Sequence, residues 1–340
     1  MRFLRILTVF LFAFSANLAY GQDYLLHTLM THTDSARSVD FSKDEKYVFS
    51  AGYDYRIVKW KIDNSENLVY LTGHTDIINY VEVNPAGTVL ASASNDSSLK
   101  LWAVNKNSLI KTLKGHSHYI NSVDFSKDGK KMITASSDNT VMIWNADAPY
   151  SIFHILRGHG DIVRQAVFSP DGVYAASCGE DKTIRIWSVR TGNLLQTVKD
   201  HNAIVTSVAF SFDGKYLASG AEDNKAILWK FVNGRLTKFH TLSNHRGKVN
   251  SLAFSKDGKI LATGSDDSDI HLWNVSNGQH ITSLIGHSAR VNDIVFSTSG
   301  TMLVSASDDN TVKVWGPFDT GTLISMPQDE EFETYSEEEE

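Results

Sequence analysis

The fold of this chain is decided by a stretch that reads GHSHYINSVDFSKDGKKMITASSDNTVMIW, residues 115–144. Within it, Asp138 follows His116 at a distance of 22 residues, and Trp144 comes six residues after Asp138. The same spacing occurs seven times along the 340 residues, at intervals of 42 to 44 residues. A fixed internal spacing repeated at such a period indicates a repeat architecture in which each copy forms one structural unit.

Four positions define each repeat: a His, a small hydroxyl residue 18 residues later, the Asp, and the Trp. Together the repeats account for every one of the 7 Trp residues of the chain. The seven sets are His32/Ser50/Asp54/Trp60, His74/Ser92/Asp96/Trp102, His116/Thr134/Asp138/Trp144, His159/Ser177/Asp181/Trp187, His201/Ser219/Asp223/Trp229, His245/Thr263/Asp267/Trp273 and His287/Ser305/Asp309/Trp315.

The pattern inside one repeat predicts short β-strands separated by turns. Residues 120–125, 132–135 and 141–144 are β-branched and aromatic runs, and turn residues separate them at 126–130 and 137–140. A fourth strand ends at an apolar residue three positions before the next His, a position that holds Leu29, Leu71, Leu113, Leu156, Val198, Leu242 and Leu284. Each repeat is therefore expected to supply four strands.

These features resemble the WD40-repeat family over roughly residues 29–315. The resemblance rests on the terminal Trp of each repeat, on Ser-x-Asp-Gly turns such as residues 126–129 and 255–258, and on Gly-His pairs at residues 73–74, 115–116, 158–159 and 286–287. It implies an all-β fold, a seven-bladed β-propeller of four-stranded antiparallel blades. The Asp that often follows the Trp in that family is replaced here, and Thr31, Asp200 and Asn244 stand where Gly would precede His, but the spacing is intact.

The resemblance also implies a structural role for the repeated set. In the family these residues form a hydrogen-bonded chain from the indole N–H through the hydroxyl to the imidazole and then to the carboxylate. Each group suits its place, because indole only donates, hydroxyl and neutral imidazole do both, and carboxylate only accepts. A fully satisfied buried polar chain rigidifies a blade. We therefore expect the seven sets to be structural tetrads.

The length predicts one domain, a propeller over residues 22–327, which we expect to be monomeric by itself. Two segments compete to supply the outer strand that closes the ring, residues 24–30 and residues 322–326. Pro317 disfavours the C-terminal candidate, since proline cannot donate a backbone hydrogen bond to a neighbouring strand. We favour closure by residues 24–30.

The N-terminus predicts export. Residues 1–21 combine two Arg residues, an apolar run and a small-residue exit, the pattern of a cleaved secretory signal peptide. An uncleaved apolar first strand is the alternative. The mature chain has no second long apolar run, so the sequence predicts no membrane span there. The mature protein is thus expected to be secreted or periplasmic, and the single cysteine, Cys178, is expected to be a buried inert thiol.

The C-terminus, residues 328–340, contains eight acidic residues. Without this tail and the two Arg of the leader, 30 of the 32 basic residues and 31 of the 39 acidic residues remain, so the propeller body is nearly neutral. The tail is expected to be a solvated disordered end, with a docking segment for a basic partner as the alternative. No basic stripe suggests nucleic-acid binding.

No catalytic, cofactor or metal motif stands out. The His residues outside the repeats show no metal-ligand spacing; they are His27, His118, His154, His240, His271 and His280. Seven equivalent sets of hydroxyl, His and Asp also disfavour catalysis, which needs one singular exposed constellation. We therefore expect no enzyme activity, no cofactor and no metal.

In WD40 proteins the mouth of the central channel is lined by the residue before the repeat Asp and by the third and fifth residues after the repeat His. Here these positions place Ile77, Tyr119, Ile162 and Ile204 as an apolar arc beside charged residues, which include Arg164, Glu180, Glu222, Lys248 and Arg290. An apolar centre with a polar rim is typical of protein interfaces. The hypothesis is that an apolar segment with basic residues docks there, with Tyr53 and Tyr119 as anchors and Glu180 and Glu222 as acceptors. The alternative is that the Ile side chains only complete the packing between blades.

Two function classes remain open. The first is a non-enzymatic scaffold that acts outside the cytoplasm and binds a protein or peptide on the propeller face. The second is a propeller that binds a small molecule or a glycan, with hydrolysis as a further option. An apolar surface favours the first, and a deep polar channel with convergent carboxylates favours the second.

Overall fold

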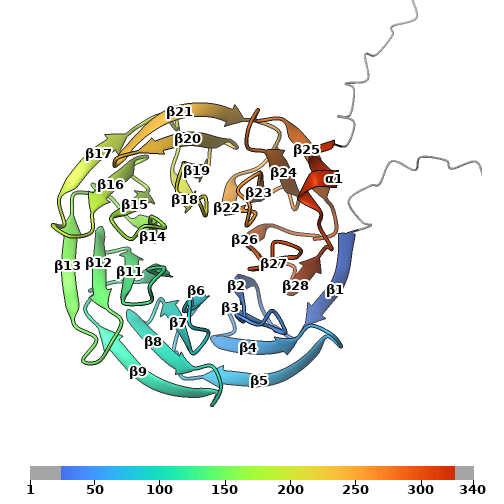
Figure 1. The fold of residues 1–340 in the computed structure, drawn as a ribbon. Coiled ribbons are helices and arrows are strands. Elements are labelled where there is room, and N and C mark those ends of the chain that lie inside the picture. Colours follow the sequence, from blue (N-terminus) through green and yellow to red (C-terminus); the bar gives the residue numbers. More distant parts are fainter. Residues whose placement is uncertain (1–23, 326–340) are drawn as a thin grey trace, which may run out of the picture.

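The computed structural model describes residues 24–325, which form seven four-stranded antiparallel sheets arranged around a central channel (Figure 1). Within each sheet the strands follow one another in order from the channel to the outside of the ring. The innermost strands are β2, β6, β10, β14, β18, β22 and β26. The predicted seven-bladed all-β propeller is confirmed.

The first three blades contain strands β2 to β13. They are β2 (Ala36–Phe41), β3 (Tyr47–Gly52), β4 (Arg56–Lys61), β5 (Glu66–Thr72), β6 (Ile78–Val83), β7 (Val89–Ser94), β8 (Ser98–Ala103), β9 (Ser108–Lys114), β10 (Ile120–Phe125), β11 (Lys131–Ser136), β12 (Thr140–Asn145) and β13 (Ile152–Arg157).

The remaining four blades contain strands β14 to β28 and the N-terminal strand β1. They are β14 (Val163–Phe168), β15 (Tyr174–Gly179), β16 (Ile184–Ser188), β17 (Leu194–Val198), β18 (Val205–Phe210), β19 (Tyr216–Ala221), β20 (Ala226–Val232), β21 (Arg235–Leu242), β22 (Val249–Phe254), β23 (Ile260–Ser265), β24 (Ile270–Asn274), β25 (His280–Leu284), β26 (Val291–Phe296), β27 (Leu303–Ser307), β28 (Thr311–Trp315) and β1 (Leu25–Met30).

Side-chain hydrogen bonds shape the turn that joins the first two strands of a blade. In blade 3 the Ser126 hydroxyl donates to Asp128 (2.7 Å), and the same carboxylate accepts the backbone N–H of Lys130 (3.0 Å). Gly129 sits between them at φ 69°, where a residue without a side chain is favoured. The Ser-x-Asp-Gly sequence is thus explained by the turn that it makes.

The hydrophobic core lies between blades rather than inside each one. One cluster, for example, joins Phe49, Ile57 and Leu71 of blade 1 to Val81 and Trp102 of blade 2. Similar clusters lie at the other blade junctions. Since each blade buries its faces only against its neighbours, the ring has to close for every blade to be covered.

The N-terminal strand completes the seventh blade. Strand β1 pairs antiparallel with β28, and Leu29 opposes Val312 in this pairing. Residues Thr320–Ser325 instead form a short helix, α1, whose Leu323 packs into the cluster between blades 6 and 7. Of the two segments that could supply the outer strand, the structure therefore uses the N-terminal one.

The expected signal peptide and the acidic tail lie outside the described residues. Within residues 24–325, no helix has the length and hydropathy needed to span a membrane.

Candidate functional site

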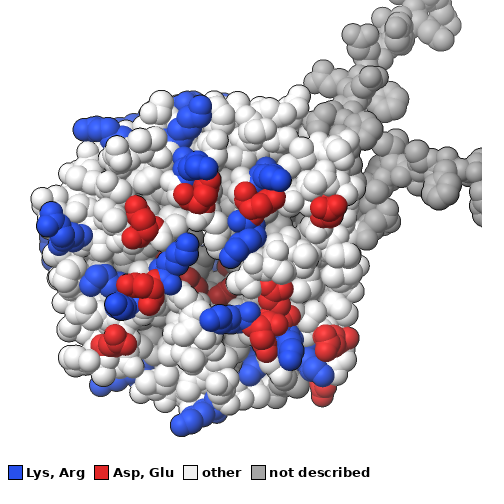
Figure 2. Space-filling model, viewed as in Figure 1, with Lys and Arg blue, Asp and Glu red and all other residues white. Residues whose placement is uncertain are grey.

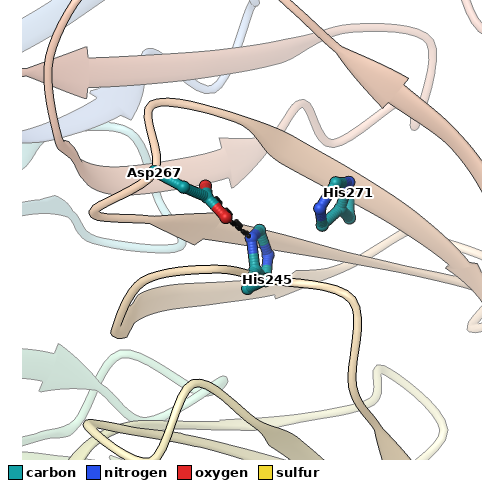
Figure 3. Close-up of side chains that lie close together, drawn as sticks. All are labelled: His245, Asp267 and His271. Atoms are coloured by element: carbon teal, nitrogen blue, oxygen red, sulfur yellow. Dashed lines mark hydrogen bonds and ion pairs between the residues drawn. The ribbon is translucent and has the colours of Figure 1, made fainter.

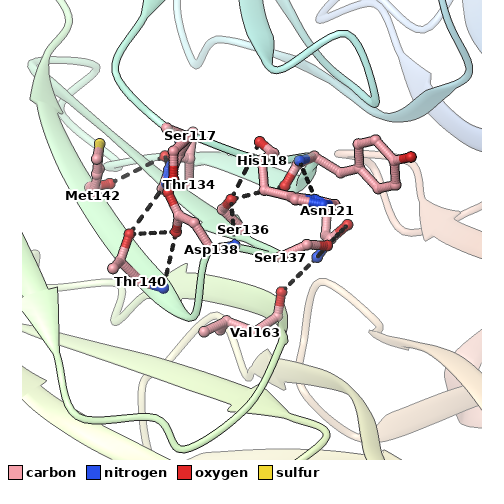
Figure 4. Close-up of polar contacts among 12 residues, drawn as sticks. Ser117, His118, Asn121, Thr134, Ser136, Ser137, Asp138, Thr140, Met142 and Val163 are labelled. Atoms are coloured by element: carbon pink, nitrogen blue, oxygen red, sulfur yellow. Dashed lines mark hydrogen bonds and ion pairs between the residues drawn. The ribbon is translucent and has the colours of Figure 1, made fainter.

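The repeated polar residues form the same hydrogen-bonded chain in every blade. In blade 3, Trp144 Nε1 donates to the Thr134 hydroxyl (2.9 Å), which lies 2.8 Å from His116 Nε2, and His116 Nδ1 lies 2.9 Å from Asp138. Figure 4 shows Thr134 and Asp138 with neighbouring residues that they contact, among them Met142, Thr140 and Ser117. In the seven blades the ring Nδ1 is 2.7 to 3.0 Å from the nearest carboxylate oxygen of its Asp.

The other six blades repeat this chain with their own residues. The indole N–H donates to the hydroxyl over 2.7 to 2.9 Å, in the pairs Trp60–Ser50, Trp102–Ser92, Trp187–Ser177, Trp229–Ser219, Trp273–Thr263 and Trp315–Ser305. The hydroxyl lies 2.7 or 2.8 Å from an imidazole Nε2, that of His32, His74, His159, His201, His245 and His287. The carboxylates at the other ring nitrogen are those of Asp54, Asp96, Asp181, Asp223, Asp267 and Asp309.

Each tetrad Asp also holds the loops beside it. The Asp138 carboxylate accepts the backbone N–H of Ser117 (3.0 Å) and of Thr140 (3.0 Å) in addition to the imidazole. Burial raises the pKa of this carboxyl, but the bonds from His116, Thr140 and the backbone outweigh burial and hold the pKa well below its usual range. The carboxylate is therefore ionised and fixes the loops that surround the channel mouth.

Backbone bonds bring the predicted mouth residues together. In all seven blades the third residue after the His offers its carbonyl to the N–H of the residue before the Asp, as from Glu180 N–H to Ile162 O at 2.9 Å. The paired positions surround a cavity of about 450 Å³ at the channel. Its lining includes Tyr53, Tyr119, Ile162, Arg164, Glu180, Glu222, Lys248 and Arg290.

The tetrads themselves lie apart from this cavity. Of the described residues that line it, none belongs to a tetrad. The hydroxyl and indole side chains of the sets are buried in the blades, as shown by Ser50, Ser92, Ser219 and Ser305 and by Trp60, Trp229 and Trp273. Even the Asp223 carboxylate, at the loop end of its tetrad, is only 12% exposed. The tetrads therefore support the mouth from within, and a ligand at the cavity does not meet them.

Two residues of the expected apolar arc also lie apart from the cavity. Of the described residues, Tyr119 and Ile162 line it, whereas Ile77 and Ile204 are not part of its lining. Both of these Ile side chains are half-buried, as is Ile162. Tyr53 and Tyr119 are exposed by 38% and 42% of their surface, so these two rings are the most accessible apolar groups among the predicted mouth residues that line the cavity.

The acidic residues of the mouth are already paired with basic ones. Glu180 lies 2.5 Å from Arg164, and Glu222 lies 2.7 Å from Lys248. Arg290 spans two blades, 2.8 Å from Asp266 and 3.6 Å from Asp308. Figure 2 shows charges of both signs around the central opening. Glu180 and Glu222, the acceptors of the binding hypothesis, thus each already hold a basic side chain through one carboxylate oxygen.

The Arg164 side chain has one unpaired N–H donor. Among residues 24–325, its Nε is the buried side-chain nitrogen that has no hydrogen-bond partner. The side chain as a whole is 40% exposed and lies at the cavity. The exposed part of this side chain can donate to an acceptor group on a ligand, whereas the unpaired Nε–H itself is buried.

Deeper in the channel lies a set of carboxyl groups that the sequence analysis did not single out. Asp40, Glu82 and Asp124 each accept a backbone N–H from the following blade, those of Val83 (2.7 Å), Phe125 (3.3 Å) and Phe168 (2.6 Å). Burial raises the pKa of Asp40 and of Asp124 to about 7. Asp293 joins blade 7 to blade 1 through the N–H of Val39 (3.1 Å), and burial raises its pKa to about 6.

A recurrent signal for these residues does exist in the sequence. Asp40, Glu82 and Asp124 each stand eight residues after a tetrad His, on the strand that faces the channel.

Cys178, on β15, is fully buried, and burial raises the pKa of its thiol.

Comparison with known proteins identifies the family to which the repeats belong. The family model described as WD domain, G-beta repeat matches seven segments, residues 23–61, 65–103, 107–145, 150–188, 192–230, 236–274 and 278–316. A comparison with curated proteins found no match. The seven matched segments together span well over half of the chain, and the structure has one blade for each of them, so the chain belongs to the WD40-repeat family.

Proposed function

We propose that this chain is a non-enzymatic scaffold outside the cytoplasm, which binds a protein or peptide segment at the channel mouth. The observation that carries the proposal is the composition of that mouth, where exposed Tyr53 and Tyr119 lie beside Ile162 and half-exposed ion pairs. Aromatic residues surrounded by polar groups are typical of binding hot spots. Proteins of this family commonly act as interaction scaffolds.

The burial of the tetrads supports a role without catalysis. The hydroxyl of Ser177 lies 2.7 Å from His159 Nε2 and accepts the indole N–H of Trp187 (2.8 Å). Ser177 itself is fully buried. A nucleophile has to reach its substrate, and a hydroxyl enclosed in this way serves the blade instead.

The structure also suggests what the bound segment looks like. Tyr rings suit an apolar or aliphatic side chain, and the exposed part of the Arg164 guanidinium offers a donor to a carbonyl or carboxylate. A basic group is accommodated where it replaces Lys248 at Glu222. We therefore expect an extended segment that combines an apolar residue with one polar group on either side.

The test is affinity purification of the mature chain from its native envelope or medium, with bound proteins identified by mass spectrometry. Tyr119→Asp with Ile162→Asp places two charges at the mouth and should abolish the capture of a stoichiometric partner. The matched control is Leu109→Asp with Ile152→Asp on the outer strands, where both residues are exposed to a similar degree. Capture that survives in the mouth variant, or that is lost equally in the control, would refute the proposed site.

The same preparation tests export. If residues 1–21 are a signal peptide, the intact mass of the recovered chain corresponds to a start at Gln22. A chain that retains residue 1 and stays in the cytoplasm would contradict this part of the proposal.

A second function has one observation in its favour. The 450 Å³ cavity is lined largely by polar side chains, among them Asn79, Gln165 and Asp293, which suits a small polar ligand such as a glycan. A folded mature chain that captures no protein but gains thermal stability with a soluble oligosaccharide would favour this alternative.

A further inference from the structure

Blade 6 differs from the other blades beside its tetrad. There, His271 of β24 faces the His245–Asp267 pair (Figure 3). One ligand atom from each of these three residues lies within 4.8 Å of the other two. The rings of His245 and His271 lie with their centroids 4.1 Å apart. Strand pairing makes this cluster, and sequence spacing alone did not reveal it.

The position of His271 carries a cation in three other blades. Four residues after the tetrad Asp, blades 2, 4 and 7 have Lys100, Arg185 and Lys313. Arg185 lies 3.6 Å from the tetrad carboxylate of Asp181. In blade 7, burial lowers the pKa of Lys313, and the Asp309 carboxylate partly offsets this effect. The fold therefore provides a place for a positive charge beside this carboxylate.

The neighbouring strand confirms that the position is equivalent. Lys100 and Lys313 each donate to a hydroxyl directly across the sheet, Thr112 and Thr28, both at 3.0 Å. In blade 6 the corresponding hydroxyl is that of Ser283, 2.8 Å from His271 Nδ1. His271 thus occupies the place of the Lys side chain without carrying its permanent charge.

Two more groups favour a cation at this place. His280 of β25 lies with Nε2 3.2 Å from His271 Nδ1, which adds a third imidazole. Asp269, two residues after Asp267, adds a second carboxyl group.

We propose that blade 6 binds a Zn²⁺ ion through His245, Asp267 and His271. Imidazole nitrogen and carboxylate oxygen are ligands that zinc prefers, and a site with three protein ligands leaves a position for water. Ser283 and His280 hold His271 Nδ1, which assigns Nε2 to the ion, and such an outer hydrogen bond is how proteins orient a metal-binding imidazole.

Proton balance at His245 can be met within the tetrad. When Nδ1 binds the ion it loses its proton, and the ring then carries its proton on Nε2 and donates to the Thr263 hydroxyl, now 2.7 Å away. Thr263 in turn donates to the backbone carbonyl of His271, which lies 3.5 Å from it. The proton that leaves Nδ1 is thus kept on the ring at Nε2, and binding of the ion releases no proton to solvent.

The distances require a small adjustment. Zinc bonds of about 2.0 to 2.2 Å place two ligands on one ion no more than about 4.3 Å apart. The ligand atoms lie within 4.8 Å of one another. Side-chain rotations that move these atoms by about half an ångström therefore bring them close enough to bind one ion.

The test uses the full mature chain, purified without a polyhistidine tag and stripped with a chelator. After incubation with Zn²⁺ and gel filtration, we expect the wild-type chain to retain one zinc ion per chain. When cobalt replaces zinc, the wild-type chain should give the visible absorption of low-coordinate Co²⁺. His271→Lys should lose both signals while keeping its thermal melt in the absence of metal, since Lys already stands at this position in blades 2 and 7.

The control is His240→Gln on the outer strand β21, which removes an imidazole away from the cluster and should leave zinc retention unchanged. The acidic tail is common to all three chains, so its own weak metal binding cancels. Equal zinc retention in wild type and His271→Lys, no zinc in wild type, or a loss of zinc in His240→Gln would each overturn the proposal.

Discussion

At the scale of single residues, the hydroxyl group is the centre of each tetrad. Ser177 connects Trp187 and His159, and both of these partners are buried as well. Its loss would leave an indole N–H and a ring nitrogen without partners in a place that water does not reach. An unsatisfied buried polar group costs about 1 to 3 kcal/mol, more than the net gain from an ordinary hydrogen bond.

We therefore expect Ser177→Ala to lower the free energy of unfolding by about 2 kcal/mol, measured by chemical denaturation. Ser243→Ala is the control, because this exposed serine lies outside the tetrads, and its change should stay within about 0.5 kcal/mol. Equal stability of the two variants would show that the hydroxyl is not needed to satisfy its neighbours.

At the scale of elements, strand β1 joins the two ends of the ring. It brings residues 25–30 against β28, so the last blade consists of strands from both ends of the chain. Leu29 points inward and is 1% exposed in the cluster between blades 7 and 1, whereas the next residue, Met30, is 74% exposed. Alternation along one strand thus separates a residue that closes the ring from one that does not.

This pair allows a matched test of closure. Leu29→Ala should lower the free energy of unfolding by about 3 kcal/mol, because it removes buried methyl groups and leaves a cavity. Met30→Ala should change it by less than about 0.5 kcal/mol. Denaturant unfolding of the two variants measures the difference, and similar values would mean that β1 contributes little to the closed ring.

At the scale of the whole molecule, buried carboxyl groups gather around the channel. Asp40, Glu82, Asp124 and Asp293 come from four different blades and tie each to the next. Burial raises the pKa of Glu82 well above its usual range, and the neighbouring Asp124 carboxylate adds to the rise. The folded ring therefore holds protons that an unfolded chain would release.

The sign of the pH dependence follows from these shifts. The pKa of Asp40 and Asp124 is about 7 in the folded chain and 3.8 when unperturbed, so the folded state binds more protons between these values. Stability should therefore fall as pH rises from about 4 to about 7. Tetrad carboxyls with a lowered pKa add stability that is lost only in stronger acid; these are Asp54, Asp96, Asp138, Asp181, Asp267 and Asp309.

We expect the thermal midpoint to be higher near pH 5 than near pH 8, by roughly 5 °C for a chain of this length. Asp124→Asn should reduce this difference, since an amide can still accept the Phe168 N–H but does not titrate. Asp63→Asn, at an exposed position, should leave it unchanged. A midpoint that rises with pH over this range would contradict the assignment of buried neutral carboxyls.

The sequence by itself determined the number of blades and the tetrads. These properties repeat with a fixed spacing, and the spacing reflects hydrogen bonds within one blade, such as that between His116 and Asp138. A pattern that serves local structure can be recognised from the order of residues alone.

Only the tertiary structure decided which segment closes the ring, how Arg164 pairs with Glu180, and that His271 and His280 join the tetrad of blade 6. The positions of Arg164 and Glu180 recur in other blades, as at Asn250 and Asp266, but the side chains at these positions differ from blade to blade. Repetition therefore could not reveal the contacts, which depend on strand register within a blade and, for β1, on pairing between the two ends of the chain.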